Sequence, residues 1–284
     1  MALEPSSPEA VFDFLETNVS PRGRAHWQWK YRLDGSSPGR AFYHVASDGT
    51  VGGFVGLLPT TLHGGDGTAR AAWFVDWATL PGEASVGAGV GLLRRAEAAT
   101  DVLLTLQGSA DTQKILPKLR WHSVDTPATW VLRLSARSVV ERGPVRGRPW
   151  LRAPALVLGA IARLRYRIAK PAAAGCALAE VERFPASYDA VWTERRSAFA
   201  PLMERTSTQL NFMCADYPGG GYRRFLVLAG SEIVGHLVLR VDRKGTMVRG
   251  RIIDALWDRD RRGMIDWLVR TACWMLQECG VDYI

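Results

Sequence analysis

The stretch AAWFVDWATLPGEASVGAGVGL, residues 71–92, combines a strand, a glycine-rich turn and the start of a helix. Residues 71–80 are almost entirely apolar, with Asp76 as the lone charge, which is typical of a strand in the centre of a sheet. Gly87, Gly89 and Gly91 follow; glycines let the backbone come close to an anion, and the first amides of a helix point toward it. The stretch therefore predicts a central strand that leads into a phosphate-binding turn.

The position of this turn does not fit the two best-known nucleotide-binding motifs. A Rossmann turn follows the first strand of its domain and has an acidic residue about 20 positions later, and a Walker loop contains Gly-Lys-Ser/Thr. Here the turn follows hairpin strands expected over 41–46 and 50–58, and the Gly-Lys-Ser/Thr tripeptide is absent. The turn therefore belongs to a sheet built from hairpins.

The surroundings of this stretch recur in the second half of the chain. Three pairs of segments align in the same order, at offsets of 183, 182 and 178 residues: 29–46 with 212–229, 51–55 with 233–237, and 73–78 with 251–256. The offset changes only at expected turns, where insertions are tolerated. Chance similarity of two hairpins is the alternative, but the shared order and spacing favour a duplicated domain.

Duplication divides the chain into three parts. We expect a first domain over 1–135, a basic linker with a helix over 136–175, and a degenerate second domain over 176–284 that ends as its fifth strand begins. Residues 137–170 hold nine basic side chains and one acidic side chain, a net charge of +8. The net charge of the whole chain is also +8, so the rest of the chain is neutral in sum. A helix over 152–170 either lies across both domains or contacts an anionic membrane surface.

The bulk composition is that of a globular protein, with 47% hydrophobic and 23% charged residues. No apolar run approaches the roughly 20 residues of a membrane-spanning helix, and the start of the chain lacks a signal-peptide pattern. The four cysteines form no CxxC motif and no metal-like pairing with the five histidines. We therefore expect a cytoplasmic protein with reduced thiols and no metal. No nucleic-acid partner is expected, because the excess charge is confined to the linker, and the oligomeric state is left open.

The order of elements resembles the GNAT superfamily of acyl-CoA N-acyltransferases. That order is helix, two hairpins, a central strand ending in Leu80-Pro81, glycine turn, helix, strand, helix and strand. The family motif (Arg or Gln, two residues, Gly, one residue, Gly or Ala) matches at Val86-x-x-Gly89-x-Gly91, with Val86 in the Arg/Gln position. The resemblance covers residues 8–135 and, more weakly, 180–284.

A later segment, Lys118-Leu119-Arg120-Trp121, is similar to the Lys-Leu-Gly-Trp/Phe of the family, with Arg120 in place of Gly. Leu116 stands where many members have a tyrosine that acts as general acid. The resemblance implies an α+β fold of tandem GNAT-like modules, each a mixed, mostly antiparallel sheet flanked by helices, with a truncated second module.

The resemblance also implies acetyl-CoA as co-substrate and no metal, with the coenzyme at the splayed end of the central strand. Backbone groups near Leu80 would pair with pantetheine, and amides of the glycine turn would bind pyrophosphate. The corresponding turn of the second copy, 257–263, has two acids and no glycine cluster, so we expect it not to bind coenzyme. The expected coenzyme-binding residues are Ala78, Thr79, Leu80, Val86, Gly87, Ala88, Gly89, Val90, Gly91 and Leu92.

Acyl transfer to an amine requires a group that accepts the ammonium proton. Asp76 is the first candidate, because burial on an apolar strand raises the pKa of a carboxylate. A structural role is the alternative, since Asp254 occupies the same position in the second copy. His122 is the second candidate, with a surface histidine as the alternative. The aromatic residues Trp27, Trp29 and Tyr31 either wall the acceptor cleft or pack in the core.

Three functions are compatible with these observations. The first is an N-acetyltransferase that transfers an acetyl group from acetyl-CoA to the primary amine of a small molecule or amino sugar. The second is a non-catalytic CoA-binding or scaffold protein, favoured by Val86 and Leu116 in place of the usual family residues. The third is an aminoacyl-tRNA-dependent transferase, because that class also has tandem modules and the basic linker could contact RNA.

Overall fold

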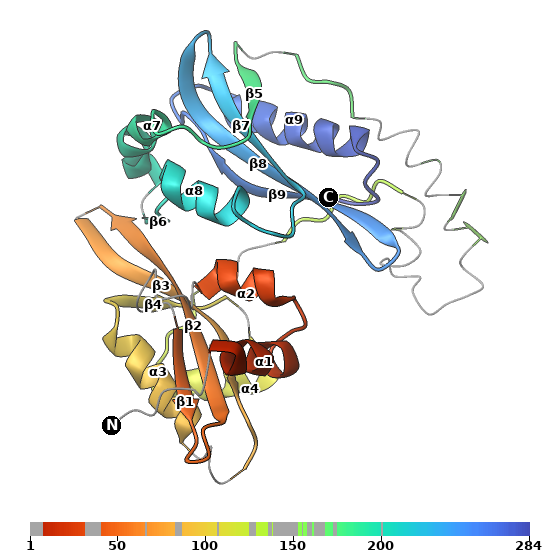
Figure 1. Ribbon diagram of the computed structural model, residues 1–284. Coiled ribbons are helices and arrows are strands. Elements are labelled where there is room, and N and C mark those ends of the chain that lie inside the picture. Colours follow the sequence, from red (N-terminus) through yellow and green to blue (C-terminus); the bar gives the residue numbers. More distant parts are fainter. Residues whose placement is uncertain are drawn as a thin grey trace. The chain divides into compact units, whose positions relative to one another are not determined.

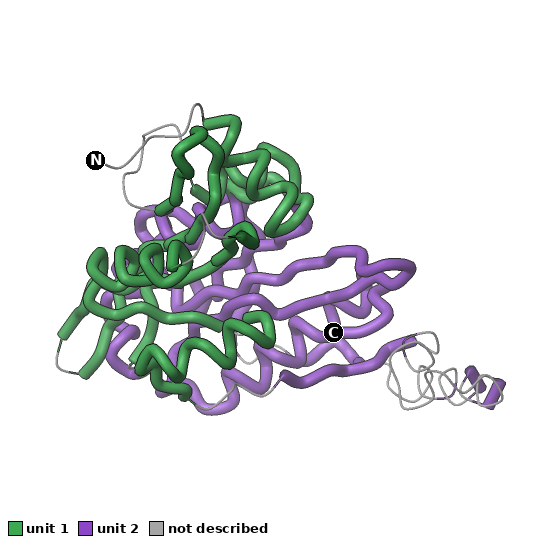
Figure 2. Tube along the Cα trace, turned by 90° about the horizontal axis from the view of Figure 1, so that it is seen from below, with its two compact units in different colours: residues 1–125, 199–204, 216–219 green, residues 126–198, 205–215, 220–284 purple. Residues whose placement is uncertain are grey.

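A computed structural model describes most of the chain. It covers residues 8–31, 41–65, 67–82, 87–106, 108–124, 129–135, 138, 153–154, 156–157, 161, 168–172, 175–199 and 201–284. Figure 2 shows two compact units: unit 1 comprises residues 1–125, 199–204 and 216–219, and unit 2 comprises 126–198, 205–215 and 220–284. Most of the expected linker, 136–175, and of its helix, 152–170, falls outside the described residues.

Unit 1 is a mixed sheet with helices packed on both faces (Figure 1). The strands lie in the order β1-β2-β3-β4, and the short strand β6 pairs with the end of β2. Strands β1, β2 and β3 are antiparallel neighbours, while β4 runs parallel to β3. The elements are α1 (Pro8–Asn18), α2 (Arg24–Tyr31), β1 (Ala41–Val45), β2 (Val51–Gly64), β3 (Gly67–Thr79), α3 (Ala88–Ala98), β4 (Val102–Leu104), α4 (Ala110–Ile115), the 3-10 helix η2 (Leu116–Leu119) and β6 (Leu202–Met203).

Unit 1 has two hydrophobic cores, one on each face of its sheet, because successive side chains of a strand point to opposite faces. Leu15 of α1 and Trp27 of α2 pack with Phe54 of β2 on one face. The next residue of β2, Val55, points to the other face and packs with Leu93 of α3. All five side chains are at most 1% exposed, so both faces of the sheet are covered.

A β-bulge interrupts the central hairpin of unit 1. The pairing of β2 with β3 shifts register once, so that Asp76 and Trp77 of β3 lie opposite the single residue Val55 of β2. Asp76 has a φ angle of 54°, which residues other than glycine rarely adopt. The bulge directs Asp76 toward α2, whereas Trp77 packs on the α3 face.

Unit 2 repeats the same plan. Its sheet has the order β5-β7-β8-β9, all antiparallel, and α9 packs on it through Trp267 and Leu268. The elements are β5 (Ala177–Val181), α7 (Tyr188–Arg195), the 3-10 helix η4 (Arg196–Phe199, of which Phe199 belongs to unit 1), α8 (Ser207–Cys214), β7 (Tyr222–Ala229), β8 (Glu232–Lys244), β9 (Met247–Leu256) and α9 (Met264–Glu278).

The sheet of unit 2 is extended by two short segments. Tyr283 forms a parallel bridge with Arg249 of β9 and an antiparallel bridge with Arg133. The Leu132 and Ile284 backbones exchange two hydrogen bonds of 2.9 and 2.8 Å. Residues 132–135 therefore belong to unit 2, and the compact units divide the chain after Asp125, ten residues before the boundary that we predict from the sequence.

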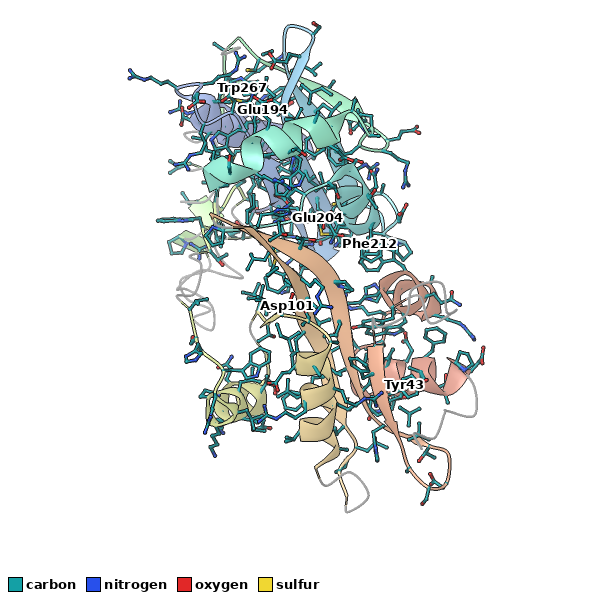
Figure 3. The ribbon with its side chains drawn as sticks, turned by 90° about the vertical axis from the view of Figure 1, so that its left-hand side faces the viewer. Tyr43, Asp101, Glu194, Glu204, Phe212 and Trp267 are labelled. Atoms are coloured by element: carbon teal, nitrogen blue, oxygen red, sulfur yellow. The ribbon has the colours of Figure 1, made fainter. Side chains whose placement is uncertain are left out.

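Atomic details of the two units match as duplication predicts. α3 and α9 are each preceded by a left-handed glycine, Gly87 with φ 77° and Gly263 with φ 75°. Asp101, labelled in Figure 3, accepts a hydrogen bond from the Arg70 amide at 3.1 Å. Asp282 accepts the equivalent bond from the Val248 amide at 2.8 Å. Among the described residues, no helix is long and apolar enough to cross a membrane.

Candidate functional site

The central strand of unit 1 runs past the end of its parallel neighbour. β3 pairs with β4 only at residues 71–73, whereas its pairing with β2 continues to Thr79. In the part of the chain that the structure describes, no strand pairs with the other edge of residues 74–79. The backbone groups on this edge are therefore available to a ligand, as expected for a splayed strand end that includes Ala78, Thr79 and Leu80.

The helix that follows this strand end begins without a side-chain cap. Gly87 is the N-cap of α3, and no side chain of the described residues accepts a hydrogen bond from the first amides of the helix. These amides have no partner within the helix, and they carry the positive end of its dipole. A Cβ atom on Gly87 or Gly91 would meet nothing within 4 Å, so no described residue fills the space beside these two glycines. Val86 lies outside the described residues.

The start of α3 packs directly on the strand end. A Cβ on Gly89 would lie 3.3 Å from Thr79 Cγ2 and 3.4 Å from Trp77 Nε1, so a larger residue would push the helix away. Trp77 Nε1 is buried and has no hydrogen-bond partner among the residues that the structure describes. Buried indole N–H groups normally find an acceptor. A donor without an acceptor beside an open helix start fits an oxygen-rich ligand such as a diphosphate or an amide.

The corresponding turn of unit 2 contains a buried, ion-paired carboxylate. Asp258, only 7% exposed, forms ion pairs with Arg195 at 2.8 Å and Arg261 at 3.1 Å. Its Oδ1 also accepts a hydrogen bond from the Asp260 amide at 3.1 Å. The start of α9 itself has no side-chain cap, and a Cβ atom on Gly263 would meet nothing within 4 Å, as at Gly87. Among the described residues, the two turns therefore differ in the buried, ion-paired Asp258 and not in the capping of the helix that follows.

Asp76 is held by two side chains of α2. Its Oδ2 accepts hydrogen bonds from Lys30 Nζ and Tyr31 Oη. Burial and the negative charge of Asp76 raise the pKa of Tyr31 well above its usual value, so the phenol stays protonated and remains a donor. Sequence reasoning missed Lys30, which lies 46 positions from Asp76 and belongs to no motif. The Asp76 carboxylate is thus fixed in position on the bulge.

The equivalent aspartate of unit 2 is held in a similar way. Asp254 forms an ion pair with Arg205 and lies 3.7 Å from Nε2 of the fully buried His236. Burial alone would raise the pKa of Asp254, but the interactions with His236 and Arg205 outweigh it, and the pKa is lowered. Tyr188 Oη in turn lies 2.6 Å from His236 Nδ1. Both copies thus place a cation beside the aspartate of the central strand.

His122 and Asp76 lie on opposite faces of the unit 1 sheet. The exposed His122 follows Trp121, which packs with Phe74 on the α3 face, whereas Asp76 contacts α2. The structure therefore does not bring the two candidate bases together. Trp27 is 1% exposed in the core. Trp29 is half-buried, with its ring 4.9 Å from that of Tyr217 in an edge-on contact.

Comparisons with known proteins agree with this geometry. No protein-family model matches the sequence, and no curated protein sequence is significantly similar to it. Among solved structures, N-myristoyltransferase from Saccharomyces cerevisiae with bound myristoyl-CoA is 11% identical, with a TM-score of 0.58 over 100% of this chain and 71% of that chain. A probable N-acyltransferase from Enterococcus faecalis is 9% identical, with a TM-score of 0.58 over 100% and 63% of the two chains.

A GCN5-related N-acetyltransferase from Anabaena variabilis is 13% identical, with a TM-score of 0.55 over 99% of this chain and 63% of that chain. At such identities the likeness establishes the fold alone. The chain has the fold of the GNAT superfamily of acyl-CoA N-acyltransferases, built from two GNAT-like modules in tandem.

Proposed function

We propose that unit 1 binds acyl-CoA and transfers its acyl group to the primary amine of a small molecule or amino sugar. The observation that carries this proposal is the start of α3, which has no side-chain cap among the described residues, beside the free edge of β3. The solved relatives, one of which contains myristoyl-CoA, support an acyl-CoA as the donor.

Each part of the site has a role in this proposal. The coenzyme supplies an activated acyl thioester. The free edge at Ala78, Thr79 and Leu80 binds its pantetheine, and the amides of residues 87–92 bind its diphosphate. Trp77 Nε1 donates a hydrogen bond to the same ligand. Asp76, positioned by Lys30 and Tyr31, accepts the proton that the attacking ammonium group must lose.

A CoA-binding protein without catalysis is the second candidate function. Two observations favour it: the Asp76 carboxylate already accepts hydrogen bonds from two donors, and Leu116 is buried in the α3 core where a family tyrosine would lie. Binding and turnover must therefore be measured separately.

The binding test uses isothermal titration with acetyl-CoA. We expect one site per chain, and the substitution Gly91→Glu should weaken binding at least tenfold, because it places a carboxylate on the exposed first turn of α3. The same charge stabilises a helix start, so the melting temperature should not fall. Ala98→Glu, at the exposed far end of α3, is the matched control and should bind acetyl-CoA normally. Equal affinity of wild type and Gly91→Glu would refute the site.

The turnover test follows thiol release from acetyl-CoA with a panel of amines. Asp76→Asn should abolish amine-dependent release without changing the acetyl-CoA affinity. Asparagine tolerates the positive φ angle of this position, so the bulge should be retained. Coenzyme binding by wild type with no release for any amine would favour the non-catalytic alternative. Full activity of Asp76→Asn would exclude Asp76 as the proton acceptor.

A further inference from the structure

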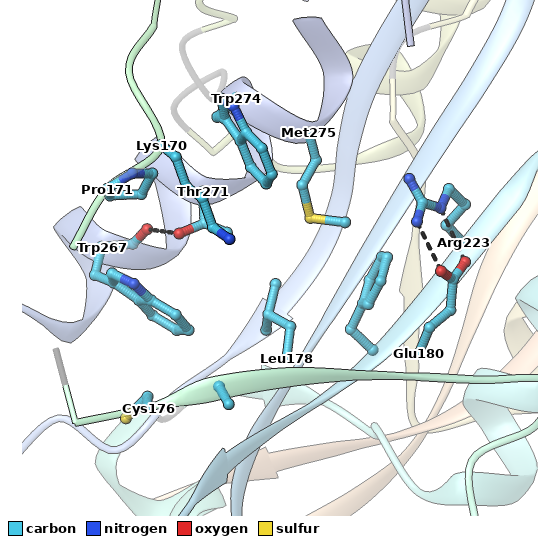
Figure 4. Close-up of a pocket in the computed structure, with 12 residues that line it drawn as sticks. Lys170, Pro171, Cys176, Leu178, Glu180, Arg223, Trp267, Thr271, Trp274 and Met275 are labelled. Carbon is cyan, nitrogen blue, oxygen red and sulfur yellow. Dashed lines mark hydrogen bonds and ion pairs between the residues drawn. The ribbon is translucent and has the colours of Figure 1, made fainter. Parts of the chain in front are cut away.

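Unit 2 contains a pocket of about 460 Å³ that the proposed acyltransfer does not use. Its floor is formed by β5 and β7, and one wall is the face of α9 that carries Trp267, Thr271 and Trp274 (Figure 4). Lys170 and Pro171, in the segment before β5, complete its rim. The volume lies within the range of about 300–1,000 Å³ that is usual for small-ligand sites.

The interior of the pocket is apolar. Leu178 of β5, Phe225 of β7 and Met275 of α9 line it together with the two tryptophans. Its one hydroxyl group, on Thr271, is already satisfied because it donates to the Trp267 carbonyl at 2.7 Å. A ligand body that lies here therefore gains free energy by burying hydrocarbon and finds few polar partners.

The charges at the rim favour an anionic head group. The Arg223 guanidinium donates two hydrogen bonds of 2.9 and 2.7 Å to the Glu180 carboxylate, so the two charges balance each other. These bonds lower the pKa of Glu180. The Lys170 ammonium lies 5.3 Å above the Trp274 ring, and no carboxylate of the described residues lies within ion-pair distance of it. Among the described residues that line the pocket, Lys170 is thus a cation at the edge that no carboxylate balances.

A cationic ligand is disfavoured, although the pocket is rich in aromatic rings. Two aromatic faces are already occupied by cations of the protein, Lys170 over Trp274 and Arg223 over Phe225 at 5.1 Å. These faces are therefore not available to a cationic ligand, and Lys170 would repel it. From the apolar lining and the unbalanced charge of Lys170 we infer that this pocket binds an aliphatic carboxylate, with its chain between α9 and β5 and its carboxylate at Lys170.

Equilibrium dialysis with radiolabelled decanoate, below its micelle concentration, tests the inference. One saturable site per chain is expected. Shorter acids should bind more weakly, by about two- to fourfold for each methylene removed. Decan-1-ol and decyltrimethylammonium, which keep the chain but remove or reverse the charge, should bind at least fivefold more weakly. Equal binding of the three C10 ligands would overturn the inference, as would the lack of a saturable site.

Variants locate the site. Lys170→Ala should weaken decanoate binding about five- to tenfold, and Lys170→Arg should restore it, because the charge is kept. Lys244→Ala, which removes an exposed cation from the end of β8, is the matched control and should bind normally. Leu178→Trp should block binding by filling the pocket without removing any contact. Unchanged affinity in both Lys170→Ala and a folded Leu178→Trp would refute the site.

The inference is independent of the proposed coenzyme site. Gly91→Glu, which disables the helix start of α3, should leave decanoate binding unchanged. Loss of decanoate binding in this variant would mean that the acid had occupied the coenzyme site, and the pocket proposal would fail. The two proposals can therefore be refuted separately.

Discussion

Two residues other than glycine, among those that the structure describes, have positive φ angles: Asp76 at 54° and Arg120 at 66°. Such conformations cost free energy and persist where the surroundings impose them. Asp76 is held by Lys30 and Tyr31 at the candidate site. Arg120 closes the 3-10 helix η2, where its amide bonds the Leu116 and Pro117 carbonyls. The glycine expected by family resemblance at position 120 fits this conformation without strain.

Arg120→Gly should therefore stabilise unit 1. The left-handed conformation favours glycine over arginine, and we expect a gain of about 0.5–1 kcal/mol in the free energy of unfolding, measured by urea denaturation. Arg94→Gly, at an exposed position inside α3, should instead lose about 1 kcal/mol, because glycine weakens a helix interior. Destabilisation by both substitutions would show that the backbone at Arg120 is not strained.

At the scale of elements, an aspartate in each unit anchors the strand that runs parallel to the central one. Asp101 lies immediately before β4, and Asp282 holds the corresponding position in unit 2. The surroundings of the two differ. Asp282 accepts hydrogen bonds from the Val248 amide and the Ser135 hydroxyl in a partly buried place, whereas Asp101 and its partner Arg70 are largely exposed.

The two anchors should therefore differ in strength. Asp282→Ala leaves two partly buried donors without an acceptor and should cost about 1–3 kcal/mol in the free energy of unfolding. Asp101→Ala should cost less than about 1 kcal/mol, since exposed ion pairs contribute little. Urea denaturation together with hydrogen exchange of the Val248 amide would measure both effects. Equal losses in the two variants would contradict the anchor role of Asp282.

Local elements were predictable because their signals lie within a few residues. The strand expected over 71–80 is observed as Gly67–Thr79, and the helix expected to begin at the glycine-rich turn is observed as Ala88–Ala98. The repeat was predictable because strand and turn patterns recur at nearly constant offsets. The contact between Lys30 and Asp76 was not predictable from the sequence. It depends on how α2 packs over the bulge in β3, and no sequence pattern specifies that packing.

At the scale of the whole molecule, the two modules share their topology. They differ more in the turn that leads into α3 in unit 1 and into α9 in unit 2. Both units keep an antiparallel hairpin, a left-handed glycine and a helix in the same order. Sequence reasoning identified the difference from the composition of the two turns. It did not reveal that Asp258 is paired with both Arg195 and Arg261, because Arg195 lies on α7, far away in the sequence. That the unit 2 turn does not bind coenzyme stays a prediction, because the start of α9, like that of α3, has no side-chain cap among the described residues.

The pairing of residues 132–135 with residues 282–284 also sets the order in which the molecule can assemble. Ser135 and Asp282 are 147 positions apart, so at about 5–20 residues per second the ribosome needs roughly 7–30 s to deliver the partner of the earlier segment. During that interval the nascent chain exposes an apolar edge that is prone to aggregation. Unit 1 has by then emerged in large part, whereas unit 2 completes its sheet only after translation has passed Tyr283, which makes chaperone protection of the nascent segment valuable.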